Sequence, residues 1–200
     1  DVNIEAYPAT PDYSLMNGAA GNVKVNAAND RVQAITTNTA LRVRCLNTAV
    51  PNGDQEVTLS GVSNKATGVQ TAVLVRCDPT LDSAYMMRIN LDSNALEIYR
   101  INAGVASLLA FTANSYTTAG THTYVFKATG TGATIALTGR IDALADLTYN
   151  DTHALRLTSG KAGFHLYNFT TNTAWMDDFS VDDLIAGGGV ANSYYYRANQ

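Results

Sequence analysis

Short runs in which apolar and polar residues alternate follow one another along most of this chain. The run 85–91 is typical, because apolar residues fall on every second position while Arg88 and Asn90 fall between them. Asp92-Ser93-Asn94 is a turn sequence, so 85–91 and the next run, 95–101, are expected to form a hairpin. Successive side chains alternate between the two faces of a strand but not of a helix. The pattern therefore predicts an all-β protein.

About a dozen such runs, spaced roughly 8–12 residues apart, are typical of a β-sandwich or barrel. Within 69–77, Val73, Val75 and Cys77 are expected to share one face. Residues 141–157 are less regular, and a short helical turn is expected around 142–147. The predicted strands are 23–28, 31–36, 40–49, 56–62, 69–77, 85–91, 95–101, 105–112, 121–128, 134–138, 163–168 and 174–181.

Charged residues make up only 15% of the chain, against roughly 25% in a typical soluble domain. Glu occurs three times and Lys four, whereas Thr, Asn and Gly, which favour strands and turns, are abundant. This composition excludes a helical bundle or a coiled coil. Few Lys and Glu remain to protect sheet edges, and a surface of Thr, Asn and Ala loses little ion hydration on contact. The composition therefore favours a protein that packs against other proteins.

The charge balance also excludes two kinds of partner. The 13 Lys and Arg against 17 Asp and Glu give a net charge of −4 and a pI of about 5.2. Neither a nucleic acid nor an anionic membrane surface is therefore expected as a partner. No apolar run approaches the roughly 20 residues that span a bilayer. With 46% hydrophobic residues, the chain can bury a substantial core.

The sequence divides into one domain with two flanking segments. Residues 1–22, with Pro8 and Pro11, are expected to be an irregular lead-in. Residues 23–186 are expected to form the β-sandwich domain. Gly187-Gly188-Gly189 is interpreted as a flexible hinge that opens a C-terminal tail, 187–200.

The tail contains three consecutive aromatic residues and an arginine, namely Tyr194, Tyr195, Tyr196 and Arg197. Protein interfaces are enriched in these residue types, and a monomer gains nothing by exposing them to water. One hypothesis is that the tail docks on a neighbouring subunit or on a larger particle. The alternative is a free end, or a tail that folds back onto its own sandwich.

Several stretches, in their order along the chain, resemble the strands of concanavalin A-like, laminin-G-like jelly-roll modules. The resemblance covers about residues 50–184, and 12–50 more loosely. It implies two antiparallel sheets packed face to face, with little or no helix. Family members often carry an Asn-Gly hairpin where this chain has Thr138-Gly139-Arg140, which leaves the local turn open. The stretches are DQEVTL at 54–59, 72–76, 85–91, 96–101, 108–109, 123–127, SGKAGF at 159–164 and DDFSVDDL at 177–184.

The resemblance implies two functions, because such modules occur in tailed-phage virions and in secreted carbohydrate-binding proteins. The Thr/Asn/Ala-rich texture looks more like the phage versions. The first hypothesis is a non-enzymatic virion structural protein, a phage capsid decoration (cement) protein that binds other virion proteins and itself as a homo-oligomer. It would lie on the capsid surface or the tail. The alternative is a carbohydrate-binding, lectin-like module on a secreted or tail-fibre protein, with an extracellular location.

Catalysis is not expected. Glycoside hydrolysis needs two carboxylates that flank the scissile bond, and the Glu-x-Asp-x-x-Glu strand of glucanases built on this sandwich is absent. The three histidines have no spacing typical of a zinc site, and His122 and His165 are expected to be partly exposed residues of strands.

Sugar-binding faces often present aromatic rings, and the glycan-binding candidates are Tyr99, Tyr167 and Trp175. One hypothesis is that Tyr99, Tyr149 and Tyr167 form an aromatic strip on the surface; the alternative is that they are ordinary surface residues, because sheets use Tyr widely there. Trp175 alternates with Phe179, which the family pattern points into the core, so Trp175 is expected in the core as well unless a bulge intervenes.

No cofactor is expected, and a structural calcium ion is the one metal that the resemblance suggests. The weak candidates for its oxygen ligands are Asn150, Asp151, Asp177 and Asp178. Cys45 and Cys77 both fall on apolar faces, and two buried thiols are favoured over a disulfide. A disulfide would require that their strands be neighbours.

Overall fold

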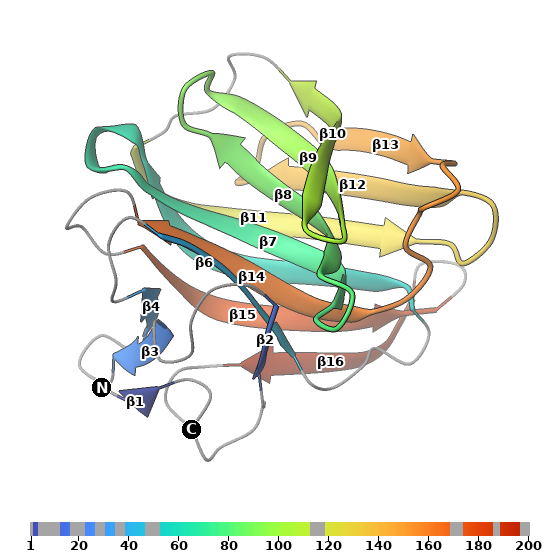
Figure 1. Cartoon of the computed structure of the whole chain (residues 1–200), viewed down its shortest axis with the longest axis horizontal. Coiled ribbons are helices and arrows are strands. Elements are labelled where there is room, and N and C mark those ends of the chain that lie inside the picture. The colour runs from blue at the N-terminus through green and yellow to red at the C-terminus, as the bar shows by residue number, and fades with distance from the viewer. Residues whose placement is uncertain are drawn as a thin grey trace.

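The computed structural model describes residues 2–3, 13–16, 23–26, 31–34, 39–46, 53–112, 119–168, 174–185 and 189–196. These residues form antiparallel strands in two layers, with no α-helix in the described ranges (Figure 1). The first sheet has the order β2-β5-β14-β7-β8-β9-β10. The second sheet has the order β13-β12-β11-β6-β15, and β4 and β16 both pair with β15. The fold is therefore the expected antiparallel β-sandwich.

The first sheet contains β2 (Tyr13–Leu15), β5 (Thr39–Leu46), β14 (Lys161–Asn168), β7 (Val69–Asp78), β8 (Ser83–Asn90), β9 (Ala95–Asn102) and β10 (Val105–Thr112). The second contains β13 (Leu147–Asp151), β12 (Ile135–Ile141), β11 (Ala119–Thr129), β6 (Gln55–Asn64), β15 (Trp175–Leu184), β16 (Val190–Tyr196) and β4 (Arg31–Ala34). Beyond β4, this sheet is extended by β3 (Val23–Asn26), which pairs with β4, and by β1 (Val2–Asn3), which pairs with β3.

The two sheets are connected at the turn between β6 and β7. Asn64 and Val69 are the residues of β6 and β7 that pair with each other. Between them lies a 3-10 turn, Lys65–Thr67, whose first free amide is capped by the Asn64 side chain. Gly68 ends the turn with φ +64°, a conformation that glycine adopts without strain. The chain thus crosses from one layer to the other through a few residues.

The apolar side chains that alternate along the strands fill the space between the sheets. Tyr85, Met87, Ile98, Tyr124 and Phe126 are fully buried there. A second apolar cluster lies on the opposite, outer face of the first sheet, and Met16 takes part in it. The lead-in thus contributes a side chain to that face, and its β2 pairs with β5.

Cys77 does not share a face with Val73 and Val75, contrary to the expectation. Val73 and Val75 belong to the core between the sheets, whereas Cys77 belongs to the outer cluster. The cause is a bulge between Val75 and Asp78, where Arg76 adopts φ +54°. One extra residue in a strand moves every later side chain to the other face.

Arg76 is fully buried and connects three loops at one end of the sandwich. A buried guanidinium is stable only when its N–H groups have acceptors. Its donors are satisfied by the carbonyl oxygens of Gly53, Leu157 and Gly130 at 3.1, 2.8 and 2.8 Å and by the Asp54 carboxylate at 3.1 Å.

Gly139 lies inside β12, so the sequence Thr138-Gly139-Arg140 forms no hairpin turn there. A Cβ on this glycine would come within 2.4 Å of the Met87 sulfur on the opposite sheet. Real side chains do not pack that closely, so the glycine allows the two sheets to approach each other.

Four strands were not expected from the sequence, namely β1 and β2 in the lead-in, β13 and β16. Residues 142–147 contain a turn with Asp142 at φ +54° rather than a helical turn, and β13 follows it directly. The tail also contributes a strand, because β16 pairs with Phe179–Leu184 of β15. The amide of Ile185 donates to the carbonyl of Gly189 at 2.9 Å, next to the antiparallel pairing of β15 with β16.

Candidate functional site

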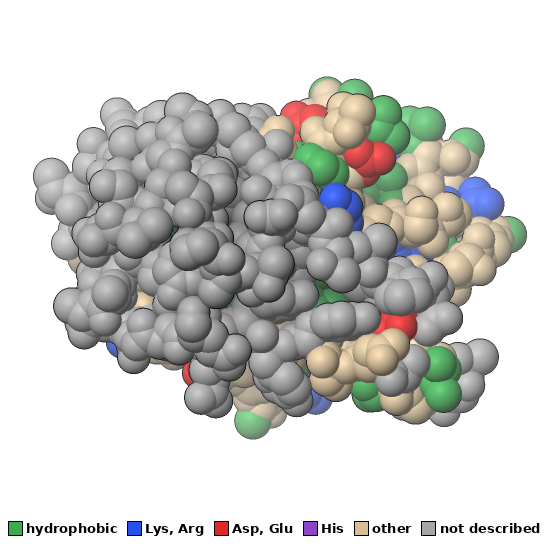
Figure 2. Space-filling model, turned by 90° about the horizontal axis from the view of Figure 1, so that it is seen from below, with side chains coloured by type: hydrophobic (Ala, Val, Ile, Leu, Met, Phe, Trp, Pro, Cys, Tyr) green, Lys and Arg blue, Asp and Glu red, His purple; other side chains and the backbone are tan. Residues whose placement is uncertain are grey.

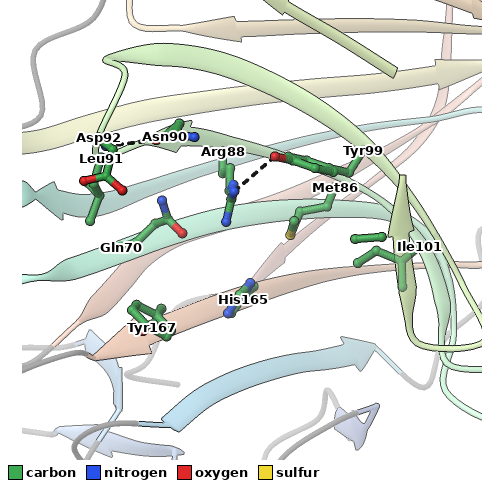
Figure 3. A pocket seen from close by; sticks show the side chains of 11 residues that line it. Gln70, Met86, Arg88, Asn90, Leu91, Asp92, Tyr99, Ile101, His165 and Tyr167 are labelled. Atoms are coloured by element: carbon green, nitrogen blue, oxygen red, sulfur yellow. Dashed lines mark hydrogen bonds between the residues drawn. The ribbon is translucent and has the colours of Figure 1, made fainter. Parts of the chain in front are cut away.

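A pocket of about 370 Å³ lies on the outer face of the first sheet (Figure 3). It is built from side chains that β14, β7, β8 and β9 project away from the core, together with the turn after β8 and one residue of β10. The lining residues are Gln70, Met86, Arg88, Asn90, Leu91, Asp92, Tyr99, Ile101, Ala106, His165 and Tyr167.

The register of the strands explains why these residues meet. Tyr167 of β14 pairs with Gln70 of β7, and His165 pairs with Ala72. Ala72 pairs in turn with Arg88 of β8. His165 and Arg88 are therefore separated by one small side chain. Residues directly opposite each other in a sheet point to the same face, so each such row contributes to one surface.

A network of charge-assisted hydrogen bonds is centred on Glu97, which is only 6% exposed. Arg88 Nε donates to Glu97 Oε2 at 3.2 Å, and the Tyr99 hydroxyl donates to the same oxygen at 2.7 Å. Asn90 Nδ2 donates to Oε1 at 2.8 Å. Three donors satisfy this buried carboxylate, which would otherwise be costly to bury. The network fixes the positions of Arg88, Asn90 and Tyr99 beside the pocket.

Arg88 contacts both the hydroxyl group and the ring of Tyr99. Arg88 Nη2 donates to its hydroxyl at 3.1 Å, and the guanidinium lies 4.9 Å from the ring centroid. The pKa of Tyr99 is raised mainly by burial and, to a lesser extent, by the hydrogen bond to Glu97. The phenol therefore stays protonated and acts as a hydrogen-bond donor to Glu97.

The rim of the pocket is formed by the turn that connects β8 and β9. Asn90 Oδ1 accepts hydrogen bonds from the amides of Asp92 and Ser93 at 2.9 and 3.2 Å, which is the usual way an Asn side chain stabilises a turn. Asp92 is exposed, and Lys65 lies 3.8 Å from its carboxylate. Asn90 thus connects the turn to the Glu97 network.

Two of the three glycan-binding candidates line the pocket, and one does not. Tyr99 and Tyr167 stand on β9 and β14, with β8 and β7 between them, three strand spacings or roughly 14 Å apart across the sheet. Along the strands they are offset by four residues, because the register places Tyr99 level with Gly163. Figure 3 shows them at opposite sides of the pocket. Tyr149 lies on β13 of the second sheet and packs against the core, so it takes no part in this site.

Trp175 is half-buried on the second sheet, and the expectation that it enters the core is wrong. A bulge between Asp177 and Ser180, with Asp178 at φ +48°, places Phe179 in the core and Trp175 on the other face. The guanidinium of Arg31 lies 3.7 Å from the Trp175 ring centroid. This cation–π contact already covers one face of the ring.

Both strand histidines are buried, although partial exposure was expected. His165 is 6% exposed at the pocket. His122 is 4% exposed and faces the space between the sheets, where its Nδ1 lies 2.9 Å from Asp142 Oδ2.

The four calcium candidates are not brought together. Asn150 and Asp151 lie on β13, and Asp177 and Asp178 lie on β15, with β12, β11 and β6 between these strands. Asp151 is fully buried and accepts hydrogen bonds from Arg100 at 2.9 Å and from Tyr85 at 2.7 Å. Within the described ranges, no group of three or more His, Cys, Asp or Glu side chains could hold a metal ion.

The cysteines lie on strands that are not neighbours. Cys45 on β5 pairs with Gly163, and Cys77 on β7 pairs with Lys161, so β14 lies between them. Two strand spacings, roughly 10 Å, exceed the 7 Å that a disulfide can bridge. Cys77 is a buried thiol, as favoured from the sequence.

The tail residues proposed as a docking element lie on an edge strand. The backbones of Tyr194, Tyr195 and Tyr196 pair with Val181, Ser180 and Phe179 of β15. Arg197 and the three tyrosine side chains lie outside the described part of the chain. Docking on a partner therefore stays a prediction.

Sequence reasoning missed most of the residues around the two pocket tyrosines, namely Gln70, Arg88, Asn90, Glu97 and His165. A signal was present for Arg88 and Asn90, because the alternation of 85–91 points both outward. The hairpin register then pairs Arg88 with Glu97. No short-range signal places His165 beside them, because β14 reaches β7 only through long-range pairing.

Neither a family model nor a curated protein sequence matches this chain. Solved structures do match it. The carbohydrate-binding module CBM66 from Bacillus subtilis has a TM-score of 0.62 and 12% identity, over 84% of this chain and 92% of that one. The β-glucanase of Bacillus licheniformis has a TM-score of 0.54 and 14% identity, over 88% of this chain and 92% of that one. The lumenal domain of VIP36, in its Ca²⁺/Man3GlcNAc-bound form, has a TM-score of 0.53 and 6% identity, over 84% of each chain.

These likenesses show that the chain has the concanavalin A-like jelly-roll fold that its sequence resembles. At such low identity they show the fold alone, and they include non-enzymatic binding modules beside a glycosidase. None of the three is described as a virion component, so the virion hypothesis, its partners and its location stay predictions. No helix in the described ranges is long and apolar enough to cross a membrane.

Proposed function

We propose that this chain is a carbohydrate-binding, lectin-like module whose glycan lies in the pocket on the outer face of the first sheet. The observation that carries the proposal is the combination of two tyrosine rings with fixed amide and guanidinium groups in one pocket. Sugar rings present both apolar C–H faces and hydroxyl groups, so a sugar site needs aromatic surface next to hydrogen-bonding groups. A surface that contacts another protein needs no such pocket.

The rigidity of the pocket supports binding as its task. Glu97 fixes Arg88, Asn90 and Tyr99 before any ligand arrives. Fixed side chains lose little conformational entropy on binding, which favours affinity. Two of the structurally similar proteins are a carbohydrate-binding module and a domain bound to Man3GlcNAc, by their own descriptions. Such a ligand fits an extracellular location or the surface of a virion.

We infer binding rather than hydrolysis from the state of the nearest carboxylates. A glycosidase needs one carboxyl group that gives up a proton and a second that attacks or activates water. Glu97 accepts three hydrogen bonds and is almost inaccessible. Asp92 lies in the exposed turn beside Lys65. Asp92 is therefore the one carboxylate that lines the pocket, and the described residues offer it no second, accessible carboxylate for this chemistry.

A glycan array tests the proposal. We expect defined glycans to bind the chain, and Arg88→Gln to weaken their binding at least about tenfold, because hydrogen bonds to a charged group contribute about 1.5–3 kcal/mol. The matched control is Arg140→Gln, which removes a half-exposed arginine from β12 of the second sheet. An array without hits, or an equal loss with both variants, would overturn the proposed function.

A further inference from the structure

The pocket has two chemically different ends, with Arg88 between them. Gln70, Asn90 and Tyr167, with Leu91 and Asp92 of the turn after β8 beside them, form a mostly polar end, whereas Met86 and Ile101 form an apolar end (Figure 3). Ala106 pairs with Ile101 and extends the apolar end. Asn90, Arg88 and Met86 stand at every second position of β8, so they follow one another on the same face. A ligand that fills the pocket therefore meets the guanidinium and an apolar surface side by side.

The guanidinium offers donors that the protein does not use. Within the described part of the chain, Arg88 donates through Nε to Glu97 and through Nη2 to Tyr99. Nη1 and its two hydrogens take no part in these bonds. The nearby acceptors are occupied, because Glu97 accepts three hydrogen bonds and Asn90 Oδ1 accepts two. The ligand must therefore bring an acceptor to Arg88.

A negatively charged acceptor is disfavoured at this place. The buried Glu97 carboxylate already neutralises Arg88, and Lys65 pairs with Asp92 at the rim. A ligand carboxylate on the free edge of the guanidinium would also face the buried Glu97 carboxylate, and the two negative charges would repel each other. An uncharged acceptor avoids this repulsion, and an amide carbonyl is a strong one.

We propose that the bound glycan contains a 2-acetamido sugar, whose carbonyl oxygen accepts from Arg88 Nη1 and whose methyl group contacts Met86, Ile101 and Ala106. This inference rests on the carbohydrate-binding function proposed above. The acetamido group joins an uncharged acceptor to a methyl group, as the two adjoining parts of the pocket require. A hydroxyl group at the same position offers an acceptor without the methyl group.

Matched glycans on the array test this inference separately from the function. The probes are N-acetylglucosamine and N-acetylgalactosamine glycans, each compared with the same glycan bearing a hydroxyl or a free amine at carbon 2. We expect the acetylated member to bind at least about tenfold more tightly, since the buried methyl alone accounts for about fourfold. Glycans that bind equally well without the acetamido group would overturn the inference and leave the function standing. An array without any hit would overturn both.

A pair of variants on β10 localises the effect. Ala106 and Ser107 are both exposed neighbours on this edge strand. Ala106 pairs with Ile101 and lines the pocket, whereas Ser107 pairs with Arg100 and points to the other face. We expect Ala106→Gln to reduce the preference for the acetylated glycan to less than about threefold by occupying the apolar end, and Ser107→Gln to leave it unchanged. A preference that survives Ala106→Gln would contradict the proposed placement of the methyl group.

Discussion

The hydroxyl of Tyr99 donates a 2.7 Å hydrogen bond to the buried carboxylate of Glu97, two residues earlier on the same strand. Both side chains point to the outer face of the first sheet, and both contact Arg88 of the neighbouring strand. This triangle holds an aromatic ring and a guanidinium in fixed positions at the edge of a pocket. A binding site of this kind is largely formed before its ligand arrives.

Glu97→Gln tests whether this network supports binding. The substitution keeps the shape of the side chain but removes the charge that orients Arg88. We expect glycan affinity to fall at least about tenfold, and the free energy of unfolding to fall by about 1–3 kcal/mol. Calorimetric titration and urea denaturation measure the two effects. Glu56→Gln, which affects a half-buried carboxylate 3.9 Å from Lys127 on the second sheet, is the control. Equal affinity in both variants would contradict the role of Glu97.

Asp151→Asn tests a buried ion pair that supports the sandwich behind the pocket. Burial alone would raise the pKa of Asp151, but hydrogen bonds from Tyr85, the His153 amide and Arg100 outweigh it and keep the pKa below 3.8. Removing one partner of a buried pair is strongly destabilising, so we expect a loss of about 3 kcal/mol near neutral pH. Asp146→Asn, at a half-exposed ion pair with Arg140, should cost at most about 0.5 kcal/mol.

The same residue gives a pH dependence with a definite sign. A carboxyl group whose pKa is lower in the folded state stabilises the protein above its unfolded pKa, and this contribution is lost as the pH falls through the folded pKa. The difference in stability between the natural chain and Asp151→Asn should therefore be constant above about pH 5 and should shrink below the ordinary value of 3.8. A difference that grows as the pH falls would contradict this account.

Gly139→Ala tests the close approach of the two sheets. The added methyl would collide with the Met87 sulfur at 2.4 Å, and we expect a loss of about 1–3 kcal/mol in thermal or urea unfolding. Gly132→Ala is the control, because a Cβ there meets nothing within 4 Å. In a chain that already carries Met87→Ala, the opposing side chain is shorter, so adding Gly139→Ala should cost less stability than it does in the natural chain. Additive losses would show that the two positions do not collide.

Deletion of residues 187–200 tests the role of β16. The deletion uncovers the edge of β15 along Phe179–Leu184, and an open edge is a template for pairing with other chains. We expect a lower unfolding temperature and association that increases with concentration, measured by light scattering. Deletion of residues 197–200 alone, which leaves β16 intact, should change neither. If the longer deletion instead abolishes an oligomer that the full chain forms, the tail docks on a partner as the sequence suggested.

The low content of charged residues is also apparent on the surface of the structure. The described part of the surface in Figure 2 is mostly apolar or uncharged, with few Lys, Arg, Asp and Glu side chains. The exposed apolar residues Leu108 and Phe111 lie on β10, next to the pocket side of the sheet. Such a surface binds sugars or proteins with little loss of ion hydration, so composition alone did not separate the two functions.

The β8–β9 hairpin shows what the sequence could predict. Its strands and turn were expected within one or two residues, because alternation and an Asn-stabilised turn are local signals. Cys77 and Trp175 were placed on the wrong faces, because the bulges at Arg76 and Asp178 use left-handed conformations and no glycine marks either position in the sequence. The short strand β13 and the strand β16 were missed because pairing with neighbours, rather than periodicity, defines them.

Only part of the candidate site was predicted from the sequence. Tyr99 and Tyr167 were selected for their ring chemistry, and both line the pocket. Arg88 and Glu97 could have been added from the hairpin register, since they pair directly. Gln70 and His165 could not, because their strands meet only through pairings between distant segments. Local patterns thus identify single residues, and long-range topology assembles them into a site.

An NMR titration tests the central claim most directly. The chain, labelled with ¹⁵N, is titrated with the glycan that binds best on the array, and the backbone amide shifts are followed. The account predicts shifts concentrated at Gln70, Arg88, Asn90, Tyr99 and His165 on the outer face of the first sheet, with unchanged amides at Glu56 and Arg140 on the second. Shifts centred on Trp175 and the second sheet, or no shifts at saturating glycan, would contradict it.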